Sequence, residues 1–99
     1  MEVLKGILKD SLAYYRRLEK DLIRRMEALP KGSVKRRRIK SRSYYYLQFR
    51  QGSKVVHKYL GVQEPKALME KIRLRRTLVR ELKKTREALH LLPQRKIRS

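Results

Sequence analysis

Hydrophobic residues in the first part of the chain recur at alternating steps of four and three positions. Six of the eight positions in this stripe are apolar, and the spacing places them along one side of an α-helix. The helix is expected to end at Leu29, because a residue that precedes proline is disfavoured in the helical conformation. The pattern therefore predicts a helix over residues 1–29, with a packed face formed by Leu4, Leu8, Ser11, Tyr15, Leu18, Leu22, Arg25 and Leu29.

A second helical pattern occupies the last third of the chain. It opens at Glu64-Pro65, and proline suits the first turn of a helix because its missing N–H needs no partner there. The pattern predicts a helix over residues 64–92, followed by a basic tail over residues 93–99. The same alternating steps predict a packed face formed by Leu68, Ile72, Arg75, Val79, Leu82, Arg86 and Leu89.

Between the two helices the hydrophobic period changes to two, which is typical of β-strands. We predict strands over residues 33–40, 44–50 and 54–60, the second of which is dense in β-forming aromatic residues. The expected connections are a turn centred on Ser41-Arg42 and a three-residue loop, Gln51-Gly52-Ser53. The predicted fold class is α+β, with two long helices forming an antiparallel hairpin and a three-stranded antiparallel β-sheet inserted between them. We expect a single domain over residues 1–99.

The assumed loop lengths determine which side chains share a face of the sheet. A three-residue second loop places Arg50 opposite Lys54, and an even-length first loop places Lys35 beside Gln48. The face toward the helices then carries Tyr45, Leu47, Phe49, Val55, His57 and Tyr59. The exposed face carries Lys35, Arg37, Tyr44, Tyr46, Gln48, Arg50, Lys54 and Lys58.

Charge is concentrated in the predicted sheet. The 99 residues include 29 Lys and Arg but only 9 Asp and Glu, a net charge of +20. Residues 30–63 contain ten of the cations and no acidic residue at all. Such a segment repels itself unless an anionic partner is present, which indicates nucleic acid as the partner. A chain of this size also has a small core, so we expect added burial from a second copy in a four-helix dimer through the helices.

The residue types in this segment match the chemistry of nucleic acids. Lys and Arg neutralise phosphates, Arg and Gln bind base edges, and Tyr rings stack on unpaired bases. Alternate residues of the first strand point to opposite faces, so Arg36 and Arg38 are expected to reach around the sheet edge. The candidate nucleic-acid-binding residues are Lys35, Arg36, Arg37, Arg38, Arg42, Tyr44, Tyr46, Gln48, Arg50, Lys54 and Lys58.

Other functional classes have little support in the sequence. The chain has no cysteine, only two well-separated histidines, and no glycine-rich phosphate loop or nucleophile elbow. We therefore expect no catalytic activity, no metal site, no cofactor and no small-molecule substrate. Charged residues interrupt the N-terminal stretch, and no run approaches the ~20 apolar residues of a membrane-spanning helix. The expected location is the cytoplasm, in association with the nucleoid or the ribosome, and no membrane partner is expected.

The central segment resembles a family of small basic proteins of archaea and bacteria whose function is uncharacterised. The resemblance covers about residues 29–75, and similar hairpins open some insertion-sequence transposases. It is carried by Gly32-Ser33-Val34, Tyr44-Tyr45-Tyr46-Leu47-Gln48-Phe49-Arg50, Gly52 and Lys58-Tyr59-Leu60-Gly61.

The segment is also similar to the three-stranded arm-binding domains of tyrosine recombinases, whose sheet enters the DNA major groove. The present chain departs from that pattern, because a long helix precedes the sheet and no catalytic domain follows it. The likeness implies a free-standing binder in which the groove-facing residues are Arg37, Tyr46, Gln48, Arg50 and Lys58.

Three functions remain open at the level of sequence. The favoured one is binding of double-stranded DNA through the basic and aromatic face of the sheet. A structured RNA is the alternative partner, because ribosomal surfaces also select basic proteins. The third is a protein-interaction module, in which the helices bind a partner and substitution of Leu22 or Val79 abolishes function.

Overall fold

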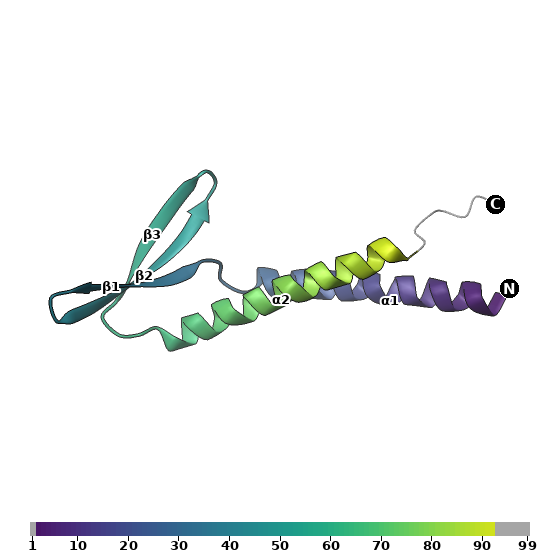
Figure 1. Ribbon diagram of the computed structural model, residues 1–99, viewed down its shortest axis with the longest axis horizontal. Helices are drawn as coiled ribbons and strands as arrows, with labels where there is room; N and C mark the ends of the chain where they lie inside the picture. Colours follow the sequence, from purple (N-terminus) through teal and green to yellow (C-terminus); the bar gives the residue numbers. More distant parts are fainter. Residues whose placement is uncertain (1, 93–99) are drawn as a thin grey trace. The chain divides into compact units, whose positions relative to one another are not determined.

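The structure is a computed structural model that describes residues 2–92. The predicted tail over residues 93–99 and the side chains of Leu4 and Leu8 lie outside the described residues. Two helices and a three-stranded antiparallel sheet confirm the α+β class and the predicted order of elements (Figure 1). The elements are α1 (Glu2–Glu27), β1 (Ser33–Ile39), β2 (Arg42–Gln51), β3 (Lys54–Gly61) and α2 (Lys66–Leu91).

The chain divides into two compact units, each described below by itself. Of the described residues, 2–28 and 77–92 make up the helical unit, and residues 29–76 make up the sheet unit. The helix α2 contributes its first part to the sheet unit and its last part to the helical unit. The single domain over residues 1–99 stays a prediction. No helix in the described part of the chain has the length of apolar sequence that crossing a membrane requires.

Leucines supply the buried side chains of the helical unit. Leu22 of α1 is buried, as are three leucines of α2 in this unit. Thr85 is also buried, and its hydroxyl donates to the Glu81 carbonyl at 2.9 Å, so the polar side chain keeps a partner away from water. An ion pair joins Glu19 Oε2 to Arg86 Nε at 3.0 Å. The buried α2 residues of this unit are Leu78, Leu82, Thr85 and Leu89.

The predicted packed face of α2 was wrong in its middle part. Val79 is 46% exposed, whereas its neighbour Leu78 is only 3% exposed. Arg86 is likewise exposed and forms the ion pair described above. The buried residues Leu78, Leu82, Thr85 and Leu89 also follow steps of four, three and four, so the spacing was right and the stripe was assigned to the wrong phase. The stripe also crosses from the sheet unit into the helical unit at residue 77, where the surroundings of α2 change.

Both turns of the sheet contain two residues. Ile39 pairs with Arg42, so the first turn consists of Lys40 and Ser41, and Lys40 takes the left-handed conformation with φ 57°. The predicted centre at Ser41-Arg42 was therefore displaced by one residue. Gln51 pairs with Lys54, so the second turn consists of two residues, and the predicted three-residue loop was wrong.

A β-bulge interrupts the pairing of β2 with β3. Tyr46 pairs with Tyr59, but the next residue of β2, Tyr45, pairs with Gly61. Leu60 is therefore the extra residue of the bulge, and the local twist of the strands increases there. The two hairpin tips point away from each other in Figure 1.

The first part of α2 holds the chain segment that enters β1. The Arg75 guanidinium donates to the Leu29 carbonyl at 2.8 Å, and Arg76 donates to the Ser33 hydroxyl at 3.1 Å. Gly32 follows the backbone of β2 so closely that a methyl group on it would lie 2.7 Å from the Gln48 carbonyl oxygen. Only glycine fits there without displacement, and its φ of 121° also favours glycine.

Candidate nucleic-acid interface

One face of the sheet, which we call the tyrosine face, collects most of the predicted binding residues. Residues that pair directly across neighbouring strands lie on the same face, and the face alternates at each successive residue. The pairings of β2 with β1 and β3 therefore determine its members. The tyrosine face consists of Ser33, Lys35, Arg37, Ile39, Arg42, Tyr44, Tyr46, Gln48, Arg50, Val55, His57 and Tyr59.

Three tyrosine rings form a cluster at the centre of this face. The ring of Tyr59 lies 5.3 Å from that of Tyr46 and 6.4 Å from that of Tyr44, measured between centroids. These separations fall within the range of favourable aromatic pairs. The Arg37 guanidinium lies over the Tyr46 ring, with its carbon 5.2 Å from the centroid, which is a cation–π contact. The cluster remains accessible, since Tyr59 is 52% exposed.

The predicted positions of β3 side chains were wrong. Val55, His57 and Tyr59 were expected to face the helices, but their pairing with Arg50, Gln48 and Tyr46 places them on the tyrosine face. Lys54 and Lys58 lie on the opposite face, so they are separated from the residues with which they were grouped. The cause is the turn length, because a change of one residue in pairing moves every side chain of a strand to the other face.

Tyr59 is the functional candidate that the sequence analysis missed. The signal that could have revealed it is the dipeptide Gly52-Ser53, because Gly-Ser between two strands is typical of a two-residue hairpin turn. With that turn, Tyr59 falls opposite Tyr46 rather than on the far side of the sheet.

The register of β1 against β2 also differs from the prediction, without changing the face. Lys35 pairs with Tyr46 instead of Gln48, and Arg37 pairs with Tyr44. A displacement of two residues returns each side chain to the same side of the pleat. The prediction that Lys35 and Arg37 share a face with Tyr44, Tyr46 and Gln48 is therefore confirmed.

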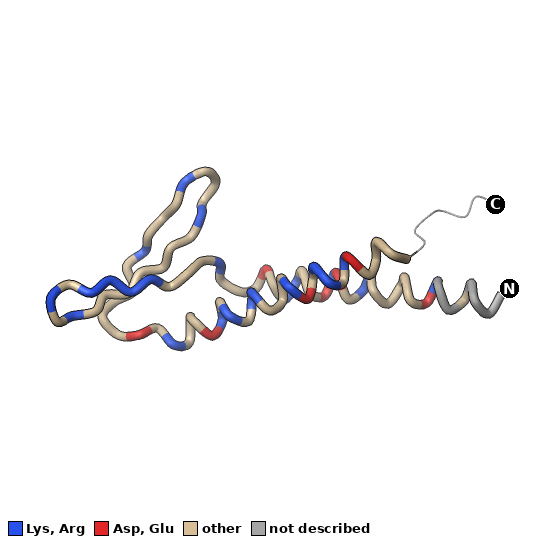
Figure 2. Tube along the Cα trace, viewed as in Figure 1, with Lys and Arg blue, Asp and Glu red and all other residues tan. Residues whose placement is uncertain are grey.

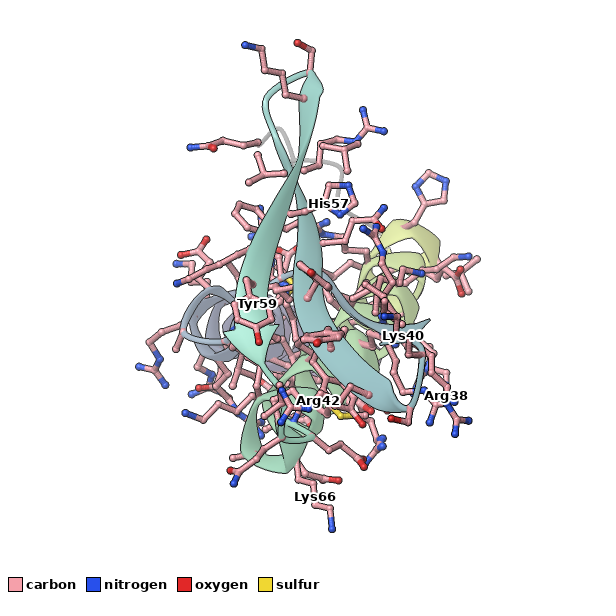
Figure 3. The ribbon with its side chains drawn as sticks, turned by 90° about the vertical axis from the view of Figure 1, so that its left-hand side faces the viewer. Arg38, Lys40, Arg42, His57, Tyr59 and Lys66 are labelled. Carbon is pink, nitrogen blue, oxygen red and sulfur yellow. The ribbon has the colours of Figure 1, made fainter. Side chains whose placement is uncertain are left out.

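The remaining candidates lie on the opposite face. Arg36 and Arg38 alternate with the β1 cations of the tyrosine face, as the sequence predicted. The side chain of Arg38 extends away from the ribbon in Figure 3. The eleven candidates thus divide into seven residues of the tyrosine face and four of the opposite face, which are Arg36, Arg38, Lys54 and Lys58.

The three strands contain many Lys and Arg residues but no Asp or Glu. Figure 2 shows consecutive basic residues along β1, and residues 28–63 contain no Asp or Glu. Ion pairs do occur within α1, within α2 and between these two helices. The strand cations therefore form an uncompensated positive surface, which attracts anions over distances of about 10 Å at moderate salt.

The described residues include no cluster of three or more His, Asp or Glu side chains arranged to hold a metal ion. The arrangement of the tyrosine face supplies phosphate-binding cations, amide and guanidinium donors, and exposed aromatic rings, all of which are groups that bind nucleic acids.

Residues 12–73 match the sequence model of a family described as "Domain of unknown function (DUF6788)". The chain belongs to this family. The matched region of the DUF6788 chain contains the end of α1, the whole sheet and the start of α2, and therefore every candidate binding residue. Searches of curated proteins and of solved structures found no match to this chain.

Proposed function

We propose that the chain is a non-catalytic nucleic-acid-binding protein whose tyrosine face contacts double-stranded DNA. The observation that carries this proposal is the packing of Arg37 and three tyrosine rings on an exposed sheet face without acidic residues. The ring contacts restrain these side chains before a partner binds, so less conformational entropy is lost in the complex.

The spacing of cations along β2 supports a duplex as the partner. Arg42 and Arg50 lie on the same face at opposite ends of the strand. Eight residues of extended strand span up to about 26 Å, which exceeds the ~12 Å width of the DNA major groove. Arg42 and Arg50 are therefore placed to contact the phosphates on the two sides of a groove, while Gln48 and Arg37 reach base edges between them.

The helices complete the proposed architecture. We infer that α1 and α2 form an antiparallel hairpin, which the ion pair between Glu19 and Arg86 and the buried leucines of the helical unit support. A second copy pairing through these helices would add burial to a small core and present two sheets to one duplex. The resemblance of the sheet to the arm-binding domains of recombinases supports the same mode of binding.

Structured RNA is the second candidate partner, and one observation favours it. The tyrosine cluster exposes aromatic surface at Tyr59, and proteins that bind unpaired bases use such rings as stacking platforms. A cytoplasmic location, at the nucleoid for DNA or at the ribosome for RNA, belongs to the proposal.

A competition assay tests the proposed function. Labelled duplex DNA, single-stranded DNA and a folded RNA are titrated with the full chain at about 50 and 200 mM salt, because phosphate-dominated binding weakens steeply over that range. Preference for the duplex with strong salt dependence is expected. Preference for the folded RNA would favour the second candidate, and weak, salt-insensitive binding to all three would overturn both and favour the helical interaction module.

A further inference from the structure

A cavity of about 280 Å³ lies between β1 and the first part of α2, within the sheet unit. Its apolar lining comes from Val34, Met69 and Ile72, the last of which is 4% exposed. The polar lining consists of Ser33 and three exposed cations, and it includes no carboxylate. The three cations are Lys35, Arg73 and Arg76.

Arg76 is held in position on the wall of this cavity. One of its terminal nitrogens, Nη2, lies 3.1 Å from the Ser33 hydroxyl and 3.3 Å from the Gly32 carbonyl oxygen. A guanidinium carries five N–H donors, so these contacts orient the group without using all of them. Arg73 is oriented in turn by its ion pair with Glu70, one helical turn earlier.

The residues around the cavity match the chemistry of a phosphate group. A guanidinium presents a planar fork that binds phosphate through two parallel hydrogen bonds, and a lysine adds a positive point charge. The volume is just below the ~300–1,000 Å³ of pockets for drug-sized molecules, so it suits a single phosphate group with part of its sugar.

A shared residue connects this cavity with the tyrosine face. Lys35 belongs to the tyrosine face and also lines the cavity. The strand that carries it, β1, is an edge strand of the sheet. A polyanion bound across the tyrosine face therefore meets Lys35 at the sheet edge and continues to Arg73 and Arg76 on α2.

We propose that the cavity between β1 and α2 binds one phosphate of a nucleic-acid backbone that passes the edge of the sheet. The phosphate chemistry stands on the cavity itself, and its nucleic-acid source rests on the proposed function. A second cavity of about 190 Å³ shares Val34 and Met69 with this one, but its charged lining is one cation and one carboxylate, Arg36 and Glu64, so it lacks the excess positive charge of the first. Continuity with the tyrosine face favours a nucleic acid over an acidic protein as the source.

The first test uses inorganic phosphate and requires no nucleic acid. Amide ¹H–¹⁵N spectra of the full wild-type chain are recorded during a phosphate titration at constant ionic strength, with chloride as the replaced anion. Saturating shifts at Ser33, Val34 and Lys35 are expected. Shifts that do not saturate at these amides, or that spread evenly over the cations of the chain, would overturn the site as an adventitious ion effect.

Two variants locate the site. In Arg73→Gln with Arg76→Gln the phosphate affinity is expected to fall at least tenfold, whereas in Arg80→Gln it is expected to stay unchanged. Arg80 is the matched control because it is exposed on the same helix but lies in the helical unit and donates to Thr77. Equal phosphate affinity in wild type and the double variant would contradict the assignment.

The second test separates the site from the proposed function. Because the double variant loses the contacts to a single phosphate, the slope of log K against log salt for duplex binding should become shallower by about 0.9. If the wild type binds phosphate at these amides but no nucleic acid at all, the site stands and the proposed function fails. If a polyglutamate peptide saturates the same amides more tightly than phosphate does, an acidic protein is the partner and the phosphate proposal is overturned.

Discussion

The guanidinium carbon of Arg37 lies 5.2 Å from the centroid of the Tyr46 ring on the neighbouring strand. The contact is diagonal, because Arg37 pairs directly with Tyr44 and Tyr46 pairs with Lys35. A cation–π contact at an exposed site contributes about 0.5–1 kcal/mol. It restrains one cation of the tyrosine face over the Tyr46 ring, which also lies 5.3 Å from the Tyr59 ring.

Charge reversal on the tyrosine face is expected to abolish nucleic-acid binding. Arg37→Glu with Arg50→Glu replaces a cation proposed to reach base edges and a cation proposed to contact phosphate by carboxylates that repel the DNA backbone, while the helical circular-dichroism signal should persist. The matched control is Arg80→Glu with Lys83→Glu, which makes the same change in net charge on exposed residues of α2. An equal loss of nucleic-acid affinity in both double variants would show that net charge alone drives binding. Wild-type affinity in Arg37→Glu with Arg50→Glu would exclude the tyrosine face as the binding surface.

The aromatic ring of Tyr46 is expected to matter more than its hydroxyl. Tyr46→Leu removes the surface on which Arg37 rests and should weaken binding by about fivefold, corresponding to ~1 kcal/mol. Tyr46→Phe keeps the ring and should stay within about twofold of wild type, since the ring supplies the cation–π attraction. Affinity is measured by fluorescence anisotropy with the same labelled duplex. A larger loss in the phenylalanine variant than in the leucine variant would be inconsistent with the ring contact.

Two adjacent residues of α2 should differ sharply in their effect on stability. Leu78→Ala removes a side chain that is 3% exposed, so the free energy of unfolding should fall by about 2–4 kcal/mol. Val79→Ala shortens a side chain that is 46% exposed, so the free energy of unfolding should change by no more than about 0.5 kcal/mol. Urea denaturation followed by circular dichroism measures both. A larger loss of stability in Val79→Ala than in Leu78→Ala would instead support the packed face that the sequence predicted.

A methyl group at Gly32 is expected to destabilise the sheet unit. Gly32→Ala places Cβ 2.7 Å from the Gln48 carbonyl oxygen, a contact that requires the backbone of β2 to move. Gly61→Ala is the matched control, because Gly61 has nearly the same φ (123° against 121°) and nothing lies within 4 Å of its Cβ position. Both variants carry backbone strain of about 1–3 kcal/mol, and overpacking adds ~1–3 kcal/mol at Gly32 alone. Equal unfolding free energies in the two variants would contradict the close approach.

The ion pair between Glu19 and Arg86 provides a test of helix pairing. Glu19→Gln and Arg86→Gln, made separately and together, form a double-mutant cycle whose coupling free energy is expected to be about 0.2–1 kcal/mol, as for other exposed ion pairs. Exchange of the two charges in Glu19→Arg with Arg86→Glu should recover most of the stability lost in either single reversal. A coupling energy of zero, with no recovery on exchange, would count against the proposed hairpin.

Much of the fold followed from local features of the sequence. The steps of four and three, the proline after Leu29 and the period of two in the centre were sufficient to predict two helices and three strands in the right order. Propensity, caps and breakers act over a few residues, so they leave a readable trace in the chain. The concentration of cations in the strands was equally evident, because it is a property of composition alone.

The membership of the tyrosine face was decided only by tertiary structure. The second turn contains two residues instead of the three that the sequence predicted. The shorter turn places Tyr59 opposite Tyr46 and moves Lys54 and Lys58 to the opposite face. The pairing of strands depends on turn conformation and on the bulge at Leu60. Since side chains alternate with a period of two, an error of one residue in pairing reverses every assignment on that strand.

The buried face of α2 and the cavity beside β1 also depended on long-range structure. Leu78 rather than Val79 is buried, and Arg76 lies near Ser33 although 43 residues separate them in sequence. Hydrophobic periodicity alone leaves the buried position along α2 uncertain by a residue, because Leu78 and Val79 are adjacent apolar residues and each continues a stripe of steps of four and three through Leu82 and Leu89. The sequence by itself thus determined which elements form and where positive charge is concentrated, whereas only packing between distant segments decided which side chains share a surface.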